Sequence, residues 1–232
     1  MNKTIKMSKN RINYPHLSKY LAEFVGIHYG DGALYMDNRY NYKVYYSFNL
    51  SKDLEFSKYF VSLFYKLFHL KLHIYYRPKR NSIELGLRCK ELYLFLKDKL
   101  KFPVGKKNHL SIPNYIKKKK SYLSLFLRGL FDTDGCVTFQ KHKYIIIKIC
   151  TKDKNFAEEI KSSLDTLEIS SCIGKKSSLR NNTLCVAYDI IIRSKNAIIF
   201  FKKVGSNNPR NYIKYKKWEC RDLNPDLPVS SS

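Results

Sequence analysis

The sequence predicts an α+β fold built from two similar halves, each running helix, two strands, helix, two strands, helix. Three observations predict it. A nine-residue segment occurs twice, the elements after each copy follow the same order, and the chain is long and apolar enough to bury a core, with 232 residues of which 44% are hydrophobic. We expect an N-terminal extension at 1–16, a first half at 17–116, a second half at 117–217 and a disordered tail at 218–232.

The repeated segment is Phe24–Gly32, which returns as Leu127–Gly135, and both copies end in Asp-Gly. Apolar residues at helical spacing precede the end of each copy, so each is predicted to close a helix. Glycine directly after the aspartate is a good residue for stopping a helix at its C-terminus.

The elements after each copy also match. In both halves a β-rich run is followed by Ser-Lys-Asp or Thr-Lys-Asp, where Ser51 and Thr151 are plausible helix N-caps. The first half is predicted to contain a strand at Lys43–Leu50, a helix from Ser51 to His69, strands at Leu72–Arg77 and Ser82–Arg88, and a helix near Lys90–Leu100. The second is predicted to contain a strand at Tyr144–Cys150, a helix from Thr151 to Leu167, strands at Ser171–Lys176 and Leu184–Ile192, and a helix near Ser194–Val204.

Small residues lie on one face of each repeated helix. Gly26 and Gly30 are four positions apart, as are Gly129 and Thr133, so each pair shares a helix face. Glycine inside a helix costs about 1 kcal/mol relative to alanine. Close packing of the two repeated helices against each other would offset that cost, and we expect these four residues at a pseudo-two-fold interface.

The charge is strongly unbalanced, with 44 Lys and Arg against 19 Asp and Glu. A net charge of +25 favours a polyanionic partner, nucleic acid first and a membrane surface second. The longest apolar runs are far too short to span a bilayer. The six cysteines show no zinc-ligand spacing and are expected to be free thiols in a reducing compartment. We expect the cytoplasm of a prokaryote, with an archaeon favoured, or an organelle.

The two repeated segments resemble the nine-residue motif of the LAGLIDADG homing endonuclease family. The second copy is a close match, and the first departs from the motif at Ile27-His28-Tyr29. The resemblance extends over about Leu17–Arg210 and implies a single-chain, two-motif protein. It further implies that the motif helices pack side by side and that two antiparallel sheets form a basic saddle over DNA.

The resemblance implies that the last acidic residues of the motifs, Asp31 and Asp134, are catalytic and bind Mg²⁺ or Mn²⁺. It adds the main-chain carbonyls of Gly30 and Thr133 as further ligands. An independent physical argument agrees. A helix C-terminus carries partial negative charge, so two carboxylates at two adjacent helix ends repel each other until a divalent cation reverses the interaction. Carboxylate oxygens suit Mg²⁺, which can polarise a phosphodiester and activate water.

The resemblance also places a lysine near each site, before an Ile-Pro segment in the first half. Lys107 fits this position, with Lys106 as the alternate. In the second half, counting from the glycine gives Asn207, whereas counting from the aspartate gives Arg210, which is a poor proton acceptor. Lys148 is a further possibility whose facing stays open. The unequal helpers lead us to expect that one strand is nicked before the other.

DNA contacts are expected from strand faces and hairpin tips. A two-stranded ribbon fits the major groove, and basic tips suit phosphates. The residues expected to contact DNA are Lys43, Tyr45, Ser47, Asn49, Arg77, Lys79, Arg80, Glu84, Arg88, Gln140, Lys148, Lys175, Lys176 and Arg180.

The expected function is therefore site-specific cleavage of double-stranded DNA at a long asymmetric site, by a monomer that promotes mobility of its host intron or element. Two alternatives use the same fold: an RNA maturase and a DNA-binding regulator that does not cleave. Loss of the motif acids would favour the alternatives, and both acids are intact.

Overall fold

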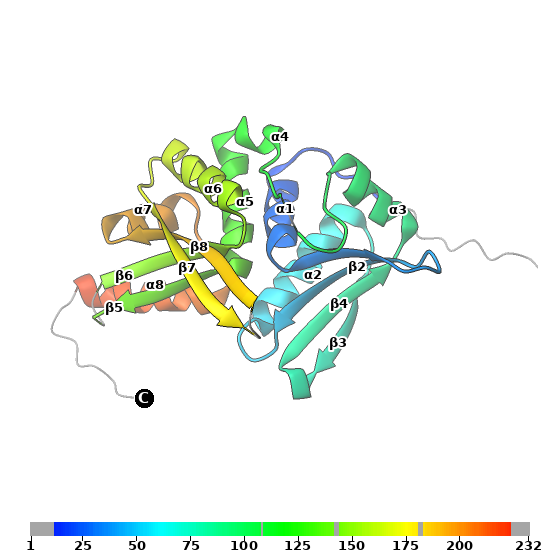
Figure 1. Cartoon of the computed structure of the whole chain (residues 1–232), viewed down its shortest axis with the longest axis horizontal. Coiled ribbons are helices and arrows are strands. Elements are labelled where there is room, and N and C mark those ends of the chain that lie inside the picture. The colour runs from blue at the N-terminus through cyan, green and yellow to red at the C-terminus, as the bar shows by residue number, and fades with distance from the viewer. Residues whose placement is uncertain (1–11, 108, 142–143, 181–182, 224–232) are drawn as a thin grey trace, which may run out of the picture.

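The computed structural model describes residues 12–107, 109–141, 144–180 and 183–223, and it confirms the α+β fold with two αββαββα halves (Figure 1). The first half contains α1 (Lys19–Asp31), β1 (Gly32–Met36), β2 (Tyr42–Asn49), α2 (Leu54–Phe68), β3 (His73–Arg77), η1 (Pro78–Arg80), β4 (Ser82–Arg88), α3 (Lys90–Leu94) and the π-helical turn η2 (Phe95–Lys99). After it come α4 (Asn114–Lys117), α5 (Lys120–Asp134), β5 (Gly135–Gln140), β6 (Tyr144–Thr151), α6 (Lys154–Thr166), β7 (Cys172–Arg180), β8 (Thr183–Arg193), α7 (Lys195–Lys203) and α8 (Pro209–Leu223).

The two sheets have the same topology. Each is antiparallel with four strands, in the orders β1-β2-β4-β3 and β5-β6-β8-β7. Side chains alternate along the strands, so Val44 and Tyr46 are buried while Tyr45 and Ser47 are exposed. We call the face that carries Tyr45 and Ser47, and its counterpart in the second sheet that carries Lys148, the open face. The helices α1, α2, α5 and α6 lie on the other side of the sheets (Figure 1).

The motif helices α1 and α5 run parallel and side by side, and glycines set their separation. A methyl group added at Gly26 would overlap the carbonyl oxygen of Phe126 and lie 2.9 Å from the Leu130 nitrogen. One added at Gly129 would overlap the carbonyl oxygen of Glu23. Backbone therefore packs directly on backbone, which offsets the intrinsic cost of glycine within these helices.

The other two small residues of the interface, Gly30 and Thr133, face each other nearer the ends of the helices. A methyl group at Gly30 would lie 2.5 Å from the β-carbon of Thr133. The Thr133 hydroxyl donates back to its own helix, 3.0 Å from the carbonyl oxygens of Gly129 and Leu130. Thr133 therefore fills the notch opposite Gly30 without leaving a polar atom unpaired.

The glycines that end the motif helices have a different role from the one expected. Gly32 and Gly135 have φ of −85° and −104°, which is extended rather than left-handed backbone. A β-carbon at Gly32 would overlap the His28 ring, and one at Gly135 would overlap Phe131. Glycine is needed because the chain passes tightly over the last helical turn, and β1 and β5 begin there at once.

The second helix of each half begins two residues later than expected. The N-caps are Asp53 and Asp153 rather than Ser51 and Thr151. The Asp153 carboxylate accepts a hydrogen bond from the Phe156 N–H at 3.2 Å, as a capping side chain does. Asp53 makes no such cap bond. Its carboxylate instead accepts a hydrogen bond from Asn208 in the second half of the chain.

The expected disordered tail at 218–232 is wrong for its first residues, because α8 continues to Leu223. The Tyr215 ring stacks on Phe201 at 3.9 Å, and Trp218 is buried. The residues from 224 to 232 lie outside the described part. The basic stretch Lys117–Lys120 joins the two halves, because α4 ends at Lys117 and α5 begins at Lys120. Within the described ranges, no helix combines the length and apolar character needed to cross a membrane.

Candidate active site

Asp31 and Asp134 are the last residues of the parallel helices α1 and α5, so both carboxylates lie at the same end of the pair. Exclusion of water by the surrounding protein raises the pKa of Asp31 to about 7, and the charge of Asp134 adds to the rise. Exclusion of water likewise raises the pKa of Asp134 to about 6. Two carboxylates held in this way favour a proton or a cation beside them.

Lys107 brings a positive charge to both carboxylates. Its ammonium group donates to the carbonyl oxygen of Tyr29 at 2.9 Å and to that of Gly30. Burial lowers the pKa of Lys107, while the charges of Asp134 and Asp31 oppose the change. In turn the ammonium lowers the pKa of each aspartate. Lys107 thus interacts with both acids, whereas the sequence suggested that it serves Asp31 alone.

Arg210 lies beside the C-terminal end of α5 and pairs with an acid of the first half. It stands in the first turn of α8, where one guanidinium nitrogen is 3.3 Å from the carboxylate of Asp53 and another is 3.4 Å from the carbonyl oxygen of Gly135. Its charge lowers the pKa of Asp31. Arg210 is thus engaged by Asp53, and the expectation that it assists Asp134 stays a prediction.

A buried polar network joins the loop before α8 to the first half. The side-chain amide of Asn208 donates to the Asp53 carboxylate at 2.8 Å and to the Asp132 carbonyl oxygen at 2.9 Å. The Asn207 amide donates to Glu23 at 2.6 Å. Burial raises the pKa of Glu23, and it raises that of Asp132 to about 7. Asn207, the alternative helper, is thus an interface residue.

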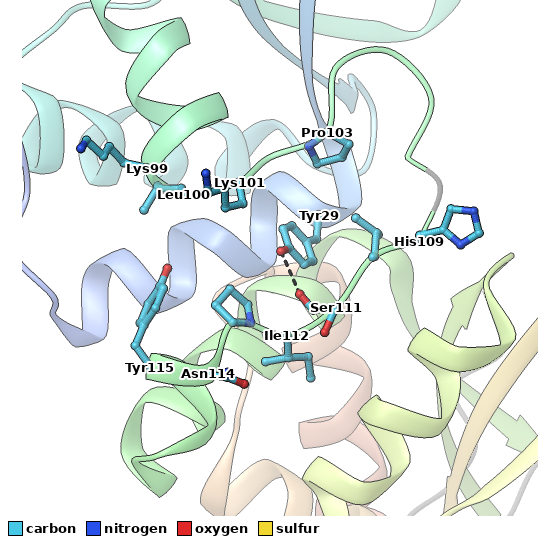
Figure 2. A pocket seen from close by; sticks show the side chains of 12 residues that line it. Tyr29, Lys99, Leu100, Lys101, Pro103, His109, Ser111, Ile112, Asn114 and Tyr115 are labelled. Carbon is cyan, nitrogen blue, oxygen red and sulfur yellow. Dashed lines mark hydrogen bonds between the residues drawn. The ribbon is translucent and has the colours of Figure 1, made fainter.

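Asp132 and its counterpart Tyr29 anchor the equivalent loops of the two halves. The Asp132 carboxylate accepts from the Ser206 hydroxyl and, at 2.9 Å, from the Asn207 N–H. The Tyr29 hydroxyl donates to the Ser111 carbonyl oxygen at 3.0 Å, a bond drawn in Figure 2. Each motif helix therefore holds the loop that follows the closing helix of its own half, and in the first half that loop carries Lys107.

A cavity of about 590 Å³ lies beside Tyr29 and Ser111 (Figure 2). Its lining comes from Tyr29, the segment 99–103 and the segment 109–115, with no acidic residue and no strand residue. It therefore belongs to the support of the loop and not to the carboxylate site.

The oxygen donors at the two aspartates fit a divalent cation in type. Among the described residues, no group of three or more His, Cys, Asp or Glu side chains could hold a metal. Two carboxylates would leave the remaining positions to water and phosphate oxygens, which is how Mg²⁺ commonly binds. The Gly30 carbonyl already accepts from Lys107, so the structure does not favour it as a metal ligand.

Most residues expected to contact DNA lie on the open face or at its tips. Strand register places Lys43, Tyr45, Ser47, Asn49, Arg77, Glu84, Arg88, Lys148 and Lys176 on the open face. Lys79 and Arg80 form the exposed tip η1, and Gln140 is exposed at the end of β5. This register also settles the facing of Lys148, which pairs with Cys136 and Ile191.

Three of the expected contact residues need correction or lie outside the description. Lys175 pairs with Tyr188 and points to the opposite side of the sheet from Lys176. The amide oxygen of Asn49 is occupied, because it accepts from Ser51 and from the Lys52 N–H in the turn before α2. The side chain of Arg180 lies outside the described part.

The pKa of Asp31 predicts a specific dependence of stability on pH. A carboxyl whose pKa is higher in the folded state than in the unfolded chain destabilises the fold as pH rises from about 4 to about 7, because ionisation costs more when folded. Asp31→Asn cannot ionise. We expect it to exceed the wild type by about 1–2 kcal/mol in free energy of unfolding near pH 8, and to lose that gain near pH 4.

Urea denaturation at the two pH values measures this difference. Asp37→Asn is the matched control, because the pKa of Asp37 is shifted in the opposite direction from that of Asp31. Hydrogen bonds from Asn41 lower the pKa of Asp37. That variant should gain nothing near pH 8. An equal gain for Asp31→Asn at both pH values would show that Asp31 ionises in the folded protein as it does in water.

Comparison with known proteins agrees with this architecture. The model of the LAGLIDADG-like domain family matches residues 121–205. A DNA polymerase of Thermococcus litoralis is 28% identical over 186 residues, which is 79% of this chain and 10% of the polymerase. The chain therefore spans about a tenth of the length of that relative.

Solved structures match over both halves. The homing endonuclease I-DmoI in complex with DNA and Mn has a TM-score of 0.59 and 20% identity, covering 81% of this chain and 96% of that one. The N-terminal LAGLIDADG domain of WhiA has a TM-score of 0.55 and 19% identity, covering 83% and 87%. The homing endonuclease I-WcaI bound to its DNA recognition sequence has a TM-score of 0.54 and 18% identity, covering 88% and 87%.

The parallel motif helices and the paired four-stranded sheets define a protein with the two-repeat LAGLIDADG fold. The LAGLIDADG-like domain model matches within the second half of the chain, and the first half repeats the same fold.

Proposed function

We propose that the chain is a site-specific endonuclease that cuts both strands of a DNA duplex at two adjoining sites, Asp31 and Asp134, with Mg²⁺ or Mn²⁺. The observation that carries the proposal is the placement of two carboxylates of raised pKa at the same end of two parallel helices, with Lys107 reaching both. Carboxylates are costly at the negative end of a helix, and phosphodiester hydrolysis with a divalent cation uses such a pair.

Each residue then has a chemical role. Asp31 and Asp134, once ionised, would hold the divalent cation, which supplies Lewis acidity toward the phosphate. Lys107 keeps a positive charge beside both carboxylates and can offset charge that develops on a phosphate. Because Arg210 is paired with Asp53, the two sites are unequal, and we propose that one strand is nicked before the other.

The nature of the similar proteins supports this proposal. I-DmoI was solved with DNA and Mn, and I-WcaI with its DNA recognition sequence. The charge of +25 and the basic residues of the open face suit a long duplex. Since one chain supplies both motif helices, we propose that it acts as a monomer and promotes mobility of a host intron or element. A maturase or a regulator that does not cleave would not require both acids.

Selection from a randomised duplex library tests the proposal. The chain is incubated with the library and Mg²⁺, and both the bound and the cut molecules are sequenced. We expect one long motif to be enriched in both pools, with cutting abolished by chelation of the metal. Selective binding without any cutting in Mg²⁺ or Mn²⁺ would support the regulator, and preference for structured RNA would support the maturase.

A further inference from the structure

Acidic residues are rare on the strands, and they occur at equivalent positions. The eight strands that the structure describes contain only two acids, Glu84 on β4 and Asp189 on β8. Glu84 pairs with Ser47 on β2 and Tyr75 on β3, and Asp189 pairs with Cys150 on β6 and Gly174 on β7. Both therefore lie on the open face, at the same place in the third strand of each sheet.

Each acid holds a base two residues along the edge strand from its direct partner. Arg77 on β3 lies 3.3 Å from Glu84, and Lys176 on β7 forms an ion pair with Asp189. An acid on a surface that faces phosphates weakens binding of any DNA. Acids retained at equivalent positions of both halves, each with a matching base, therefore indicate base reading rather than phosphate contact.

The two pairs differ in what they expose. The Arg77 and Glu84 side chains are 52% and 34% exposed, so both can reach a base edge. The Asp189 side chain is only 2% exposed beneath Lys176, whose side chain is 59% exposed. Asp189 is thus a positioning residue that fixes the ammonium group, while Glu84 can itself accept a hydrogen bond.

We propose that Arg77–Glu84 and Lys176–Asp189 are equivalent base-reading units that select guanine at two positions placed symmetrically about the cleavage centre, on opposite strands. Arginine and lysine read the O6 and N7 acceptors of guanine in the major groove, and a carboxylate accepts from the cytosine amino group. The first-half unit therefore reads a whole G·C pair, and the second-half unit reads the guanine alone. The proposal rests on the proposed function, because it requires a DNA duplex on the open face.

The test is a binding selection with Ca²⁺, followed by competition assays on the selected duplex. We expect guanine at two positions equidistant from the centre, and about tenfold weaker binding when either is replaced. Arg77→Gln should remove the preference only at the first position, and Lys176→Gln only at the second. Asp189→Asn should weaken the preference at the second position while leaving the first intact.

Two further variants complete the test, one as a control and one for the cytosine contact. Glu55→Gln removes an acid whose ion pair with Lys58 lies on the surface of α2, and it should change neither position. Glu84→Gln should relax the choice of cytosine opposite the first guanine. Selective binding with no symmetric guanines, or guanines unaffected by all four strand variants, overturns this inference and leaves the endonuclease intact. Absence of any selective DNA binding overturns both.

Discussion

Gly129→Ala is expected to destabilise the protein by about 3 kcal/mol or more, or to prevent folding, because the added methyl group has no room. It would overlap the carbonyl oxygen of Glu23 and lie 2.9 Å from the nitrogen and 3.1 Å from the γ1-carbon of Ile27. These are mostly backbone atoms of a buried helix, so relief requires separating α1 from α5. The free energy of unfolding in urea measures the effect.

The matched control is Gly86→Ala on β4. There an added β-carbon would lie 3.8 Å from its nearest neighbours, an ordinary contact, so stability should change little. Gly26→Ala should repeat the loss, since its methyl group would overlap the carbonyl oxygen of Phe126 in the equivalent contact of the other helix. If Gly129→Ala and Gly86→Ala unfold at the same urea concentration, the helices do not pack as closely as described.

Asp31→Asn and Asp134→Asn are each expected to lower the cleavage rate about a thousandfold or more, because a divalent cation contributes several kcal/mol and an amide holds it poorly. DNA affinity should stay equal or rise, since each change removes a negative charge near phosphates. Rates on the selected duplex under saturating protein separate cleavage from binding.

Asp37→Asn serves as the control for this pair as well. It removes an acid in the turn between β1 and β2, where the Asp37 carboxylate accepts from Asn41, and it should cut at the wild-type rate. A variant at Asp31 or Asp134 that cuts as fast as Asp37→Asn would show that its carboxylate is not needed.

The fold could be predicted from the sequence because repetition reveals it at several levels. The motif copies, the strand alternation and the spacing of Gly26 and Gly129 all indicate the same arrangement. The helix α8 could not be predicted in this way, because it has no counterpart in the first half. Its buried ring contacts, Tyr215 on Phe201, depend on a surface that exists only after the second half has folded.

The site was predicted less completely, because counting along the chain does not give position in space. Asp31 and Asp134 are fixed to helix ends and lie where the motif placed them. Arg210 begins a helix that the repeat does not predict, and it pairs with Asp53 from the other half. Lys107 stands on a loop whose path depends on its contacts with α1. The acid Asp189 was missed, although a single acid in an otherwise apolar strand is a visible signal.

We propose that the ends of α1 and α5 form one cleavage centre with two unequal sites. Strand-resolved cleavage tests it most directly: the selected duplex carries a different label on each strand, and wild-type protein is added with Mg²⁺. We expect both strands to be cut, with one product appearing before the other. Tight binding of the duplex with both strands left intact would contradict it.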